Sequence, residues 1–233
     1  MLQTGYLHTG ERVNPDFNNT NFQNHFKVYQ FLLQFVAGKD VLDVGCGTGY
    51  GSDYLASAAR SVIGIDLSYS AVAFARKRYP RPQFLRMDAH QLALADKSVD
   101  LVVSNENFEH LANQDQHLRE VARVLRADGM CFIATPNRRV CGESNPYHVR
   151  EFTAGELESL LNQHFAEVQV VDSLMRDAGD NSLVPPSPLA VFGNTVDTTY
   201  QSNTHSLFSF ALPSSGSARA SRRVPVGTLV KSP

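Results

Sequence analysis

The sequence has few cysteines, no long apolar run and almost no excess of charge, and each shortage excludes a class of protein. Three scattered cysteines, Cys46, Cys131 and Cys141, suit reduced thiols in a cytosol better than a disulfide framework. No apolar run approaches the length of a membrane span, and the first six residues lack the features of a signal peptide. A formal net charge of -2 does not favour a long nucleic acid as partner. We therefore predict a cytoplasmic protein that binds neither membranes nor long polyanions.

The composition is that of a globular domain, with 42% hydrophobic and 19% charged residues in 233. We predict an N-terminal cover segment at 1–37, a main domain at 38–212 and a disordered tail at 213–233. The tail contains basic but no acidic residues and lacks apolar periodicity. Within the main domain, residues 177–203 are rich in Pro, Ser, Asn and Asp and predict a long loop.

In the main domain, short apolar segments alternate with segments of helical periodicity. This alternation predicts an α/β fold in which helices cover both faces of a doubly wound, mostly parallel sheet. The predicted strands are 41–44, 62–65, 83–86, 101–103, 130–134, 168–171 and 206–212. Helices are predicted at 22–36, 50–59 and 70–79, around 118–125, and after the capping box formed by Thr153 and Glu156.

A glycine-rich segment, DVGCGTG at residues 43–49, lies where the first strand should meet the next helix. Glycines at such a junction let the backbone approach a ligand, and the helix start offers unpaired N–H groups. The alternative is a tight turn without a ligand, which three alternating glycines make less attractive. The dinucleotide pattern G-x-G-x-x-G/A does not fit, because its third small position falls on Tyr50 or Ser52. A nicotinamide-dependent dehydrogenase is therefore disfavoured.

This segment resembles the first motif of class I S-adenosylmethionine-dependent methyltransferases, which include ubiquinone-pathway O-methyltransferases. The resemblance covers roughly residues 10 to 172 and implies a Rossmann-like, seven-stranded sheet whose last strand is antiparallel. It also implies roles for residues at the carboxyl ends of successive strands. Asp43 is expected near the methionine portion of the cofactor, Asp66 at the ribose, Asp88 at the adenine amino group, and Asn105 beside the carboxylate or methyl group. The predicted cofactor-binding residues are Asp43, Gly45, Gly47, Gly49, Asp66, Leu67, Asp88, Ala89 and Asn105.

Taken alone, two of these acids have simpler interpretations. Asp66 would suit a helix N-cap, although Ser68 or Ser70 could serve instead. Asp88 would more often be an ordinary loop aspartate.

A second group of polar residues follows the fourth strand, where the sequence reads E-x-x-E-H. In a helical turn, Glu106, Glu109 and His110 would share one face, and a divalent cation would relieve the repulsion between the carboxylates. His148 begins a later H-x-x-x-F-T segment. The combination resembles small-RNA 3′-end 2′-O-methyltransferases, and this implies a divalent cation on Glu106, Glu109, His110 and His148. Mixed oxygen and nitrogen ligands suit Mg²⁺ or Mn²⁺, and Fe²⁺ and Zn²⁺ stay open as alternatives. A further histidine of those enzymes and their recognition region have no counterpart here. The alternative leaves both glutamates solvated or capping, with His110 as a lone acid–base or packing residue.

The choice between a metal site and a lone histidine base depends on the chemistry of the acceptor. An aliphatic hydroxyl, with a pKa of about 16, needs a metal to acidify it, whereas a phenol, with a pKa of about 10, could use a histidine base. We therefore predict an O-methyltransferase of a hydroxylated small molecule, with His110 and His148 as catalytic candidates. Two alternatives stay open: an N- or C-methyltransferase with a histidine base, and a non-catalytic regulator that binds the cofactor. The sequence leaves the acceptor and the oligomeric state undetermined.

Overall fold

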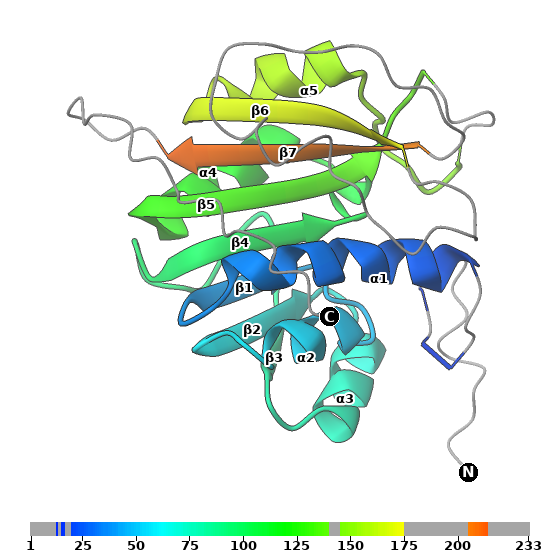
Figure 1. Ribbon diagram of the computed structural model, residues 1–233, viewed down its shortest axis with the longest axis vertical. Helices are drawn as coiled ribbons and strands as arrows, with labels where there is room; N and C mark the ends of the chain where they lie inside the picture. Colours follow the sequence, from blue (N-terminus) through cyan, green and yellow to red (C-terminus); the bar gives the residue numbers. More distant parts are fainter. Residues whose placement is uncertain (1–12, 14, 17–19, 140–144, 175–204, 214–233) are drawn as a thin grey trace, which may run out of the picture.

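A single seven-stranded sheet forms the centre of the molecule, with helices on both sides (Figure 1). The computed structural model describes residues 13, 15–16, 20–139, 145–174 and 205–213. The strand order is β3-β2-β1-β4-β5-β7-β6. The predicted class, a doubly wound and mostly parallel α/β sheet, is therefore confirmed. The strands are β1 (Asp40–Val44), β2 (Ser61–Asp66), β3 (Gln83–Arg86), β4 (Val99–Asn105), β5 (Leu125–Pro136), β6 (Phe165–Leu174) and β7 (His205–Pro213).

The register of the parallel strands aligns their carboxyl ends along one edge of the sheet. Val44 at the end of β1 pairs with Ile65 and with Ser104, so β1, β2 and β4 finish together. Asp66 pairs with Arg86, which places the end of β3 beside the end of β2. The antiparallel strand β7 lies between β5 and β6. Loops that follow β1 to β4 therefore meet at the edge where open α/β sheets bind ligands.

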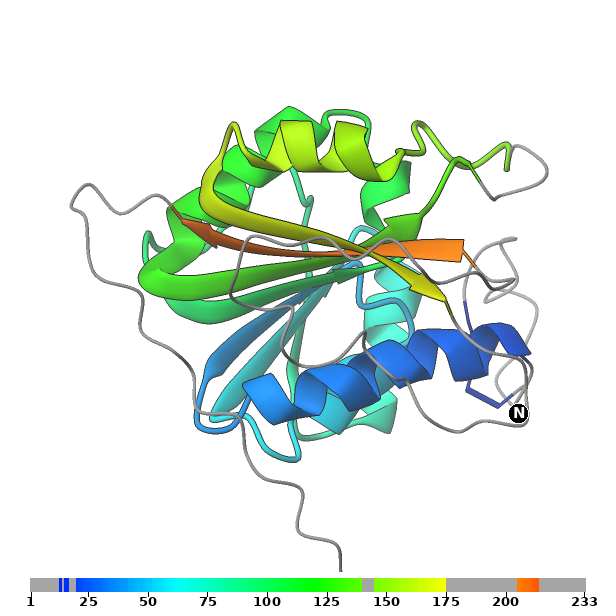
Figure 2. The ribbon, with the colours of Figure 1, turned by 45° about the horizontal axis from the view of Figure 1, so that its top comes forward.

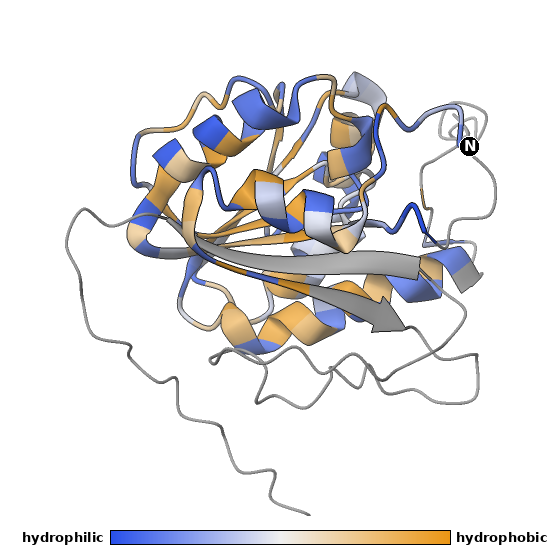
Figure 3. Cartoon of the chain, turned by 90° about the horizontal axis from the view of Figure 1, so that it is seen from above, coloured by the Kyte–Doolittle hydropathy of each residue, from blue (hydrophilic) through white to orange (hydrophobic). Residues whose placement is uncertain are grey.

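Alternate residues of the strands build two apolar cores. Leu42 of β1 belongs to the core shared with α4 and α5, whereas Val41 belongs to the core shared with α1 and α2. Figure 2 shows α1 on one side of the sheet and α4 and α5 on the other. The central strands are largely hydrophobic, and the helices carry both kinds of residue (Figure 3). The helices are α1 (Thr20–Leu32), α2 (Tyr50–Leu55), α3 (Tyr69–Arg78), α4 (Gln114–Val124), α5 (Ala154–Leu161) and the short 3-10 helix η2 (Leu33–Phe35).

Several element boundaries differ from the sequence-based prediction. The helix predicted at 50–59 ends at Leu55. Beyond it, the N–H groups of Ser57 and Ala58 bond to carbonyls three residues back, which gives a tighter turn than that of an α-helix. β5 is longer than predicted and starts at Leu125, directly after α4. The capping box of Thr153 and Glu156 is confirmed.

Some predictions concern residues that the structure does not describe. The predicted loop at 177–203, the tail beyond Pro213 and Cys141 lie outside the described residues. So does most of the cover segment before Thr20. Among the described residues, no helix is both long and apolar enough to cross a membrane.

Candidate cofactor and acceptor site

The glycine-rich turn between β1 and α2 has a backbone that glycine adopts more readily than any other residue. Gly45, Gly47 and Gly49 have φ angles of 71°, 54° and 86°, all in the left-handed region. The N–H groups of Gly45 and Cys46 both donate to the carbonyl of Ile65 at 2.9 Å and hold the turn against β2. A Cβ atom at Gly45 or Gly49 would collide with neighbouring side chains, whereas one at Gly47 would meet no atom of the described residues within 4 Å. The space beside Gly47 is therefore open to a ligand.

Asp66, at the end of β2, joins the glycine turn to the start of α3. Its Oδ2 accepts the N–H of Gly47 at 3.0 Å, and its Oδ1 accepts the N–H of Ser68 at 2.8 Å. Ser68 is the N-cap of α3 and accepts the N–H of Ala71, so Asp66 is not needed for that role. Leu67 is 64% exposed. Asp66 and Leu67 thus lie next to the glycine turn, where the sequence predicts the cofactor.

Asp88 and Ala89 follow β3 at the same edge of the sheet. The N–H of Met87 donates to the carbonyl of Asp66 at 3.1 Å and brings this segment next to β2. Oδ1 of Asp88 accepts the backbone N–H of His90 at 2.9 Å and lies 2.7 Å from the Nδ1 atom of the same residue. These two hydrogen bonds lower the pKa of Asp88, so its carboxylate is ionised and can accept further hydrogen bonds.

Asp43 lies in the interior behind the glycine turn and is only 1% exposed. The Ser52 hydroxyl donates to Oδ2 of Asp43 at 2.6 Å, and the Tyr29 hydroxyl donates to Oδ1 at 3.3 Å. Burial raises the pKa of Asp43 to about 7, against the opposing effect of these two hydrogen bonds. Tyr29 and Ser52 are not predicted from the sequence, because neither belongs to a motif that marks it as a partner of Asp43. The predicted contact between Asp43 and the cofactor stays a prediction.

The N-terminal cover segment contacts the carboxyl edge of the sheet through backbone carbonyls. The Thr48 hydroxyl donates to the carbonyl of Val13, and the Asn105 amide donates to the carbonyl of His25, both at 3.2 Å. The Oδ1 atom of Asn105 is buried and accepts no hydrogen bond from the described residues. Buried acceptors nearly always have a donor. This atom therefore marks a position where a ligand N–H or O–H group would fit.

The Glu and His residues after β4 do not share one helical face, contrary to the prediction. The helix here, η3 (Phe108–His110), is a single 3-10 turn, and Glu106 precedes it with a φ angle of 48°. The N–H of Glu106 donates to the carbonyl of Ala134 and continues the pairing of β4 with β5, so Glu106 stays out of the turn. Glu109, His110 and His148 do come together, with one ligand atom from each lying within 4.8 Å of the others. We call these three residues the Glu/His cluster. Glu106, which the sequence predicts as a fourth ligand, is not one of the three residues that come together.

Each member of the Glu/His cluster has a second polar partner. The Thr135 hydroxyl donates to Oε2 of Glu109 at 2.9 Å. Nδ1 of His110 lies 3.0 Å from the Tyr147 carbonyl.

His148 is held in the same way, because its Nδ1 lies 2.6 Å from Oε1 of Glu151. The loop that carries His148 is fixed to η3, since the N–H groups of Val149 and Arg150 both donate to the carbonyl of Glu109. No motif predicted Thr135, Tyr147 or Glu151, although Glu151 lies within the H-x-x-x-F-T segment.

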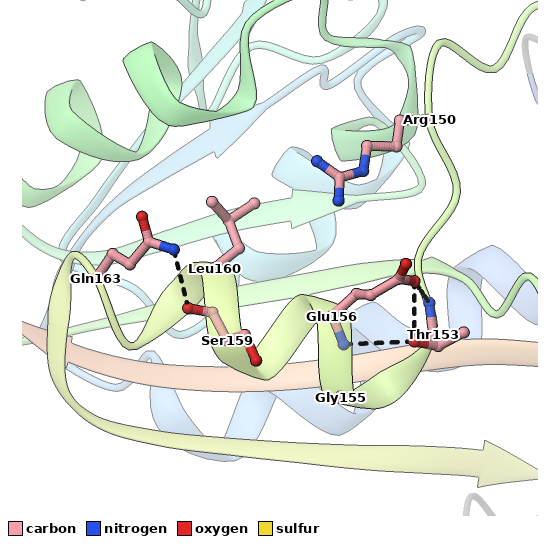
Figure 4. Close-up of a pocket in the computed structure, with 7 residues that line it drawn as sticks. All are labelled: Arg150, Thr153, Gly155, Glu156, Ser159, Leu160 and Gln163. Carbon is pink, nitrogen blue, oxygen red and sulfur yellow. Dashed lines mark hydrogen bonds between the residues drawn. The ribbon is translucent and has the colours of Figure 1, made fainter.

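A surface depression on α5 carries none of the predicted chemistry (Figure 4). The start of α5 is closed by its own capping box, in which Thr153 accepts the N–H of Glu156 and Glu156 accepts the N–H of Thr153. Arg138 adds an ion pair of 2.8 Å to Glu156. These polar groups satisfy one another, so we place the functional site at the carboxyl edge of the sheet. The depression is lined by Arg150, Thr153, Gly155, Glu156, Ser159, Leu160 and Gln163.

Comparison with known proteins identifies the family of this chain. Residues 42–133, which include the glycine turn and η3, match a family described as a methyltransferase domain. Over 178 residues the chain is 42% identical to a probable S-adenosylmethionine-dependent methyltransferase of Mycolicibacterium smegmatis, a match that covers 73% of this chain and 69% of that protein. The chain belongs to the class I S-adenosylmethionine-dependent methyltransferases. A probable methyltransferase of the same kind from Mycobacterium tuberculosis is 45% identical over 160 residues, or 66% of this chain. This methyltransferase chain spans only 58% of the length of that relative.

Two further similarities are to an O-methyltransferase and to a solved structure. The ubiquinone biosynthesis O-methyltransferase of Sinorhizobium medicae is 34% identical over 136 residues, which cover 57% of this chain and 55% of that enzyme. The crystal structure of an S-adenosylmethionine-dependent methyltransferase from Aquifex aeolicus superposes with a TM-score of 0.59 at 18% identity, covering 82% of this chain and 90% of that one. The second similarity shows the fold alone.

Proposed function

We propose that this methyltransferase transfers the methyl group of S-adenosylmethionine to a hydroxyl oxygen of a small molecule. We further propose that the Glu/His cluster holds a divalent cation at the acceptor. Transfer to oxygen is supported by the similarity to a ubiquinone-pathway O-methyltransferase. The cation is supported by the hydrogen bonds that hold Glu109, His110 and His148 in place, since each residue has a second polar partner outside the cluster.

The open side of the glycine turn fits the cofactor. The space beside Gly47 has room for a ligand, and the carboxylates of Asp66 and Asp88 lie along the same edge to accept hydrogen bonds from ribose and adenine. The buried Oδ1 of Asn105 would accept a hydrogen bond from the ammonium group of the methionine portion. We assign the cofactor contacts to these residues, together with Gly45 and Gly49.

The hydrogen bonds of the two histidines define which ring nitrogens can bind a cation. A carbonyl can only accept, so Nδ1 of His110 carries the proton that is donated to Tyr147. In neutral His110, Nε2 is therefore a lone-pair donor, and it lies 3.7 Å from Oε1 of Glu109. A cation placed between these two atoms would be attracted by both.

His148 has the same arrangement with different partners. Nδ1 of His148 donates to the carboxylate of Glu151, and Nε2 accepts the amide N–H of Asn145 at 3.0 Å. The Asn145 amide is oriented by the N–H of Tyr147, which donates to its Oδ1. A histidine whose second nitrogen is bound to a carboxylate is the usual arrangement of a metal-binding imidazole. The amide of Asn145 would have to leave Nε2 when a cation binds.

The donor atoms bear on which cation would bind. The cluster offers two imidazole nitrogens and one carboxylate oxygen, and it lacks the second carboxylate predicted from the sequence. Mg²⁺ prefers oxygen ligands, whereas imidazole suits Mn²⁺, Fe²⁺ and Zn²⁺ better. We therefore favour Mn²⁺ over Mg²⁺. When bound, such a cation supplies a Lewis acid that lowers the pKa of an acceptor hydroxyl.

The segment that leads into the cluster contacts the glycine turn. Asn107, two residues before Glu109, packs so closely against Gly45 that a Cβ atom on Gly45 would lie 2.3 Å from Oδ1 of Asn107. The acceptor would thus be held near the methyl group, as methyl transfer requires.

Direct metal binding tests this proposal without knowledge of the acceptor. Protein freed of metal by a chelator should bind one Mn²⁺ per chain in a calorimetric or electron-paramagnetic titration. Glu109→Gln and His148→Ala should weaken Mn²⁺ binding at least about tenfold, because each removes a ligand or its charge. Both variants should bind S-adenosylhomocysteine as the wild type does, since the glycine turn does not depend on the cluster.

Glu106→Gln is the matched control, because it removes a neighbouring carboxylate outside the cluster and should leave Mn²⁺ affinity unchanged. Absence of stoichiometric binding in the wild type, or equal losses in all three variants, would contradict a metal site. His110 would then be the candidate general base for a more acidic acceptor such as a phenol.

A further inference from the structure

The segment that follows β3, residues 88–94, is held to α4 by side chains of that helix. We call it the adenine-side loop. The amide of Gln116 donates to the carbonyl of His90 at 3.0 Å, and Glu120 accepts the N–H of Leu92 at 2.7 Å. Arg123 donates to the carbonyls of Leu92 and Leu94. The loop is thus anchored on a helix of the main core.

The ring of His90 connects the start of this loop to the N-terminus of α4. Its Nε2 lies 3.2 Å from the backbone nitrogen of Asn113, whose N–H can only donate. Nε2 must therefore be the unprotonated nitrogen, and Nδ1 carries the proton that is donated to Oδ1 of Asp88 at 2.7 Å. These two partners, in different parts of the chain, fix the tautomer and the orientation of the ring. Both bonds from His90 reach the same oxygen of Asp88, and Oδ2 is left to accept from a ligand.

A second histidine holds the next residue of the loop. Nδ1 of His117 lies 2.9 Å from the carbonyl of Ala89, so this nitrogen also carries a proton. His117 is fully buried, and burial lowers its pKa to about 4, which keeps the ring neutral. Its Nε2 is buried without a hydrogen-bond partner among the described residues. The titratable groups that face His117 are Asp88, His90 and Glu120.

We propose that His90 is a positioning residue that orients the Asp88 carboxylate toward the adenine amino group and so sets the selectivity of the cofactor site for adenine. This inference rests on the proposed contact between Asp88 and the adenine amino group. Asp88 is more than half exposed, and an exposed side chain has several rotamers of similar energy. The His90 ring, fixed by Asn113 at the N-cap of α4, selects one of them. His90 therefore acts through Asp88 and needs no contact of its own with the base.

The test compares S-adenosylhomocysteine with its analogue in which purine replaces adenine and the amino group is missing. In the wild type, calorimetry should show that the adenine compound binds about tenfold or more tightly than the purine analogue. A preference of this size corresponds to one hydrogen bond to a charged group. His90→Ala should reduce this preference about three- to tenfold, while the affinity for the purine analogue changes little. In an Asp88→Ala background, His90→Ala should cause no further loss, because the two residues act as one unit.

Gln91→Ala is the matched control, since Gln91 is an exposed neighbour in the same loop and should keep the full preference. His90→Asn, which retains a short donor to the carboxylate, should restore part of it. A purely structural role for His90 would weaken both ligands equally, and that result would overturn the proposal. An unchanged preference in His90→Ala would overturn it too. A wild type that binds both ligands equally would instead disprove the Asp88 contact, and failure to bind S-adenosylhomocysteine at all would refute the proposed cofactor site.

Discussion

At the scale of single residues, Asp43 combines a position in the glycine motif with full burial. Burial favours the protonated form in the folded state, where its pKa is about 7, against an ordinary value of about 4 in the unfolded chain. Stability from this group is therefore fully present below about pH 4 and is lost as the pH rises toward 7. We expect the free energy of unfolding of the wild type, measured against Asp43→Asn, to fall by about 1.4 kcal/mol per pH unit in this window.

Urea denaturation of both proteins at several pH values between 4 and 8 measures this difference. Other titrating groups cancel in the comparison, because they are the same in both chains. Above about pH 7 the difference should become constant, since Asp43 is then ionised in both states. A difference that grows in favour of the wild type as the pH rises would mean that the charged form is the one stabilised.

At the scale of elements, the glycine turn has two positions at which substitution by alanine should lower the free energy of unfolding by different amounts. Gly49→Ala would place a methyl group 2.7 Å from Cβ of Ala75 and from the ring of Phe84, in a left-handed backbone. We expect a loss of about 2–4 kcal/mol in the free energy of unfolding. Gly47→Ala meets no neighbour among the described residues, so it should cost only about 1 kcal/mol in the free energy of unfolding, from its left-handed backbone. Its methyl group should nevertheless weaken S-adenosylhomocysteine binding at least about tenfold, because it occupies the space assigned to the cofactor.

Thermal melting and calorimetry on the two variants separate stability from binding. If Gly47→Ala bound the cofactor product as well as the wild type does, the ligand would have to lie elsewhere along the sheet edge.

The local sequence predicts most strands and helices because apolar periodicity is a property of neighbouring residues. It does not predict the path after β4. The left-handed backbone of Glu106 depends on its hydrogen bond to Ala134, which belongs to a different strand. An E-x-x-E-H pattern therefore suggested one helical face where the chain forms a single 3-10 turn.

The same limit applies to the candidate site. The glycine turn, Asp66 and Asp88 could be located because strand ends converge in any parallel sheet. Thr135, Glu151 and His90 gain their importance from contacts that no pattern in their own segments reveals.

At the scale of the whole molecule, β7 joins the last part of the sheet to the rest. It pairs with β5 on one side and with β6 on the other, although it comes from residues 205–213 at the far end of the sequence. Without it, the edge of β5 from Cys131 to Pro136 would lose its backbone partners, and β6 would have no neighbour in the sheet. Unpaired buried backbone groups are costly, so this strand should be essential for the fold.

Two truncated chains test this topology. A chain that ends at residue 204 lacks β7, and we expect its melting temperature to fall by more than about 10 °C. The packing of α5 should also loosen, because Leu157 and Leu161 share the core that β6 helps to cover. His148 lies in the loop between β5 and α5, so Mn²⁺ binding should be lost with the packing of α5. A chain that ends at residue 213 keeps β7 and should melt as the full chain does. Equal stability of the two truncated chains would show that β5 and β6 hold together without the strand between them, and the arrangement of this half of the sheet would then be different.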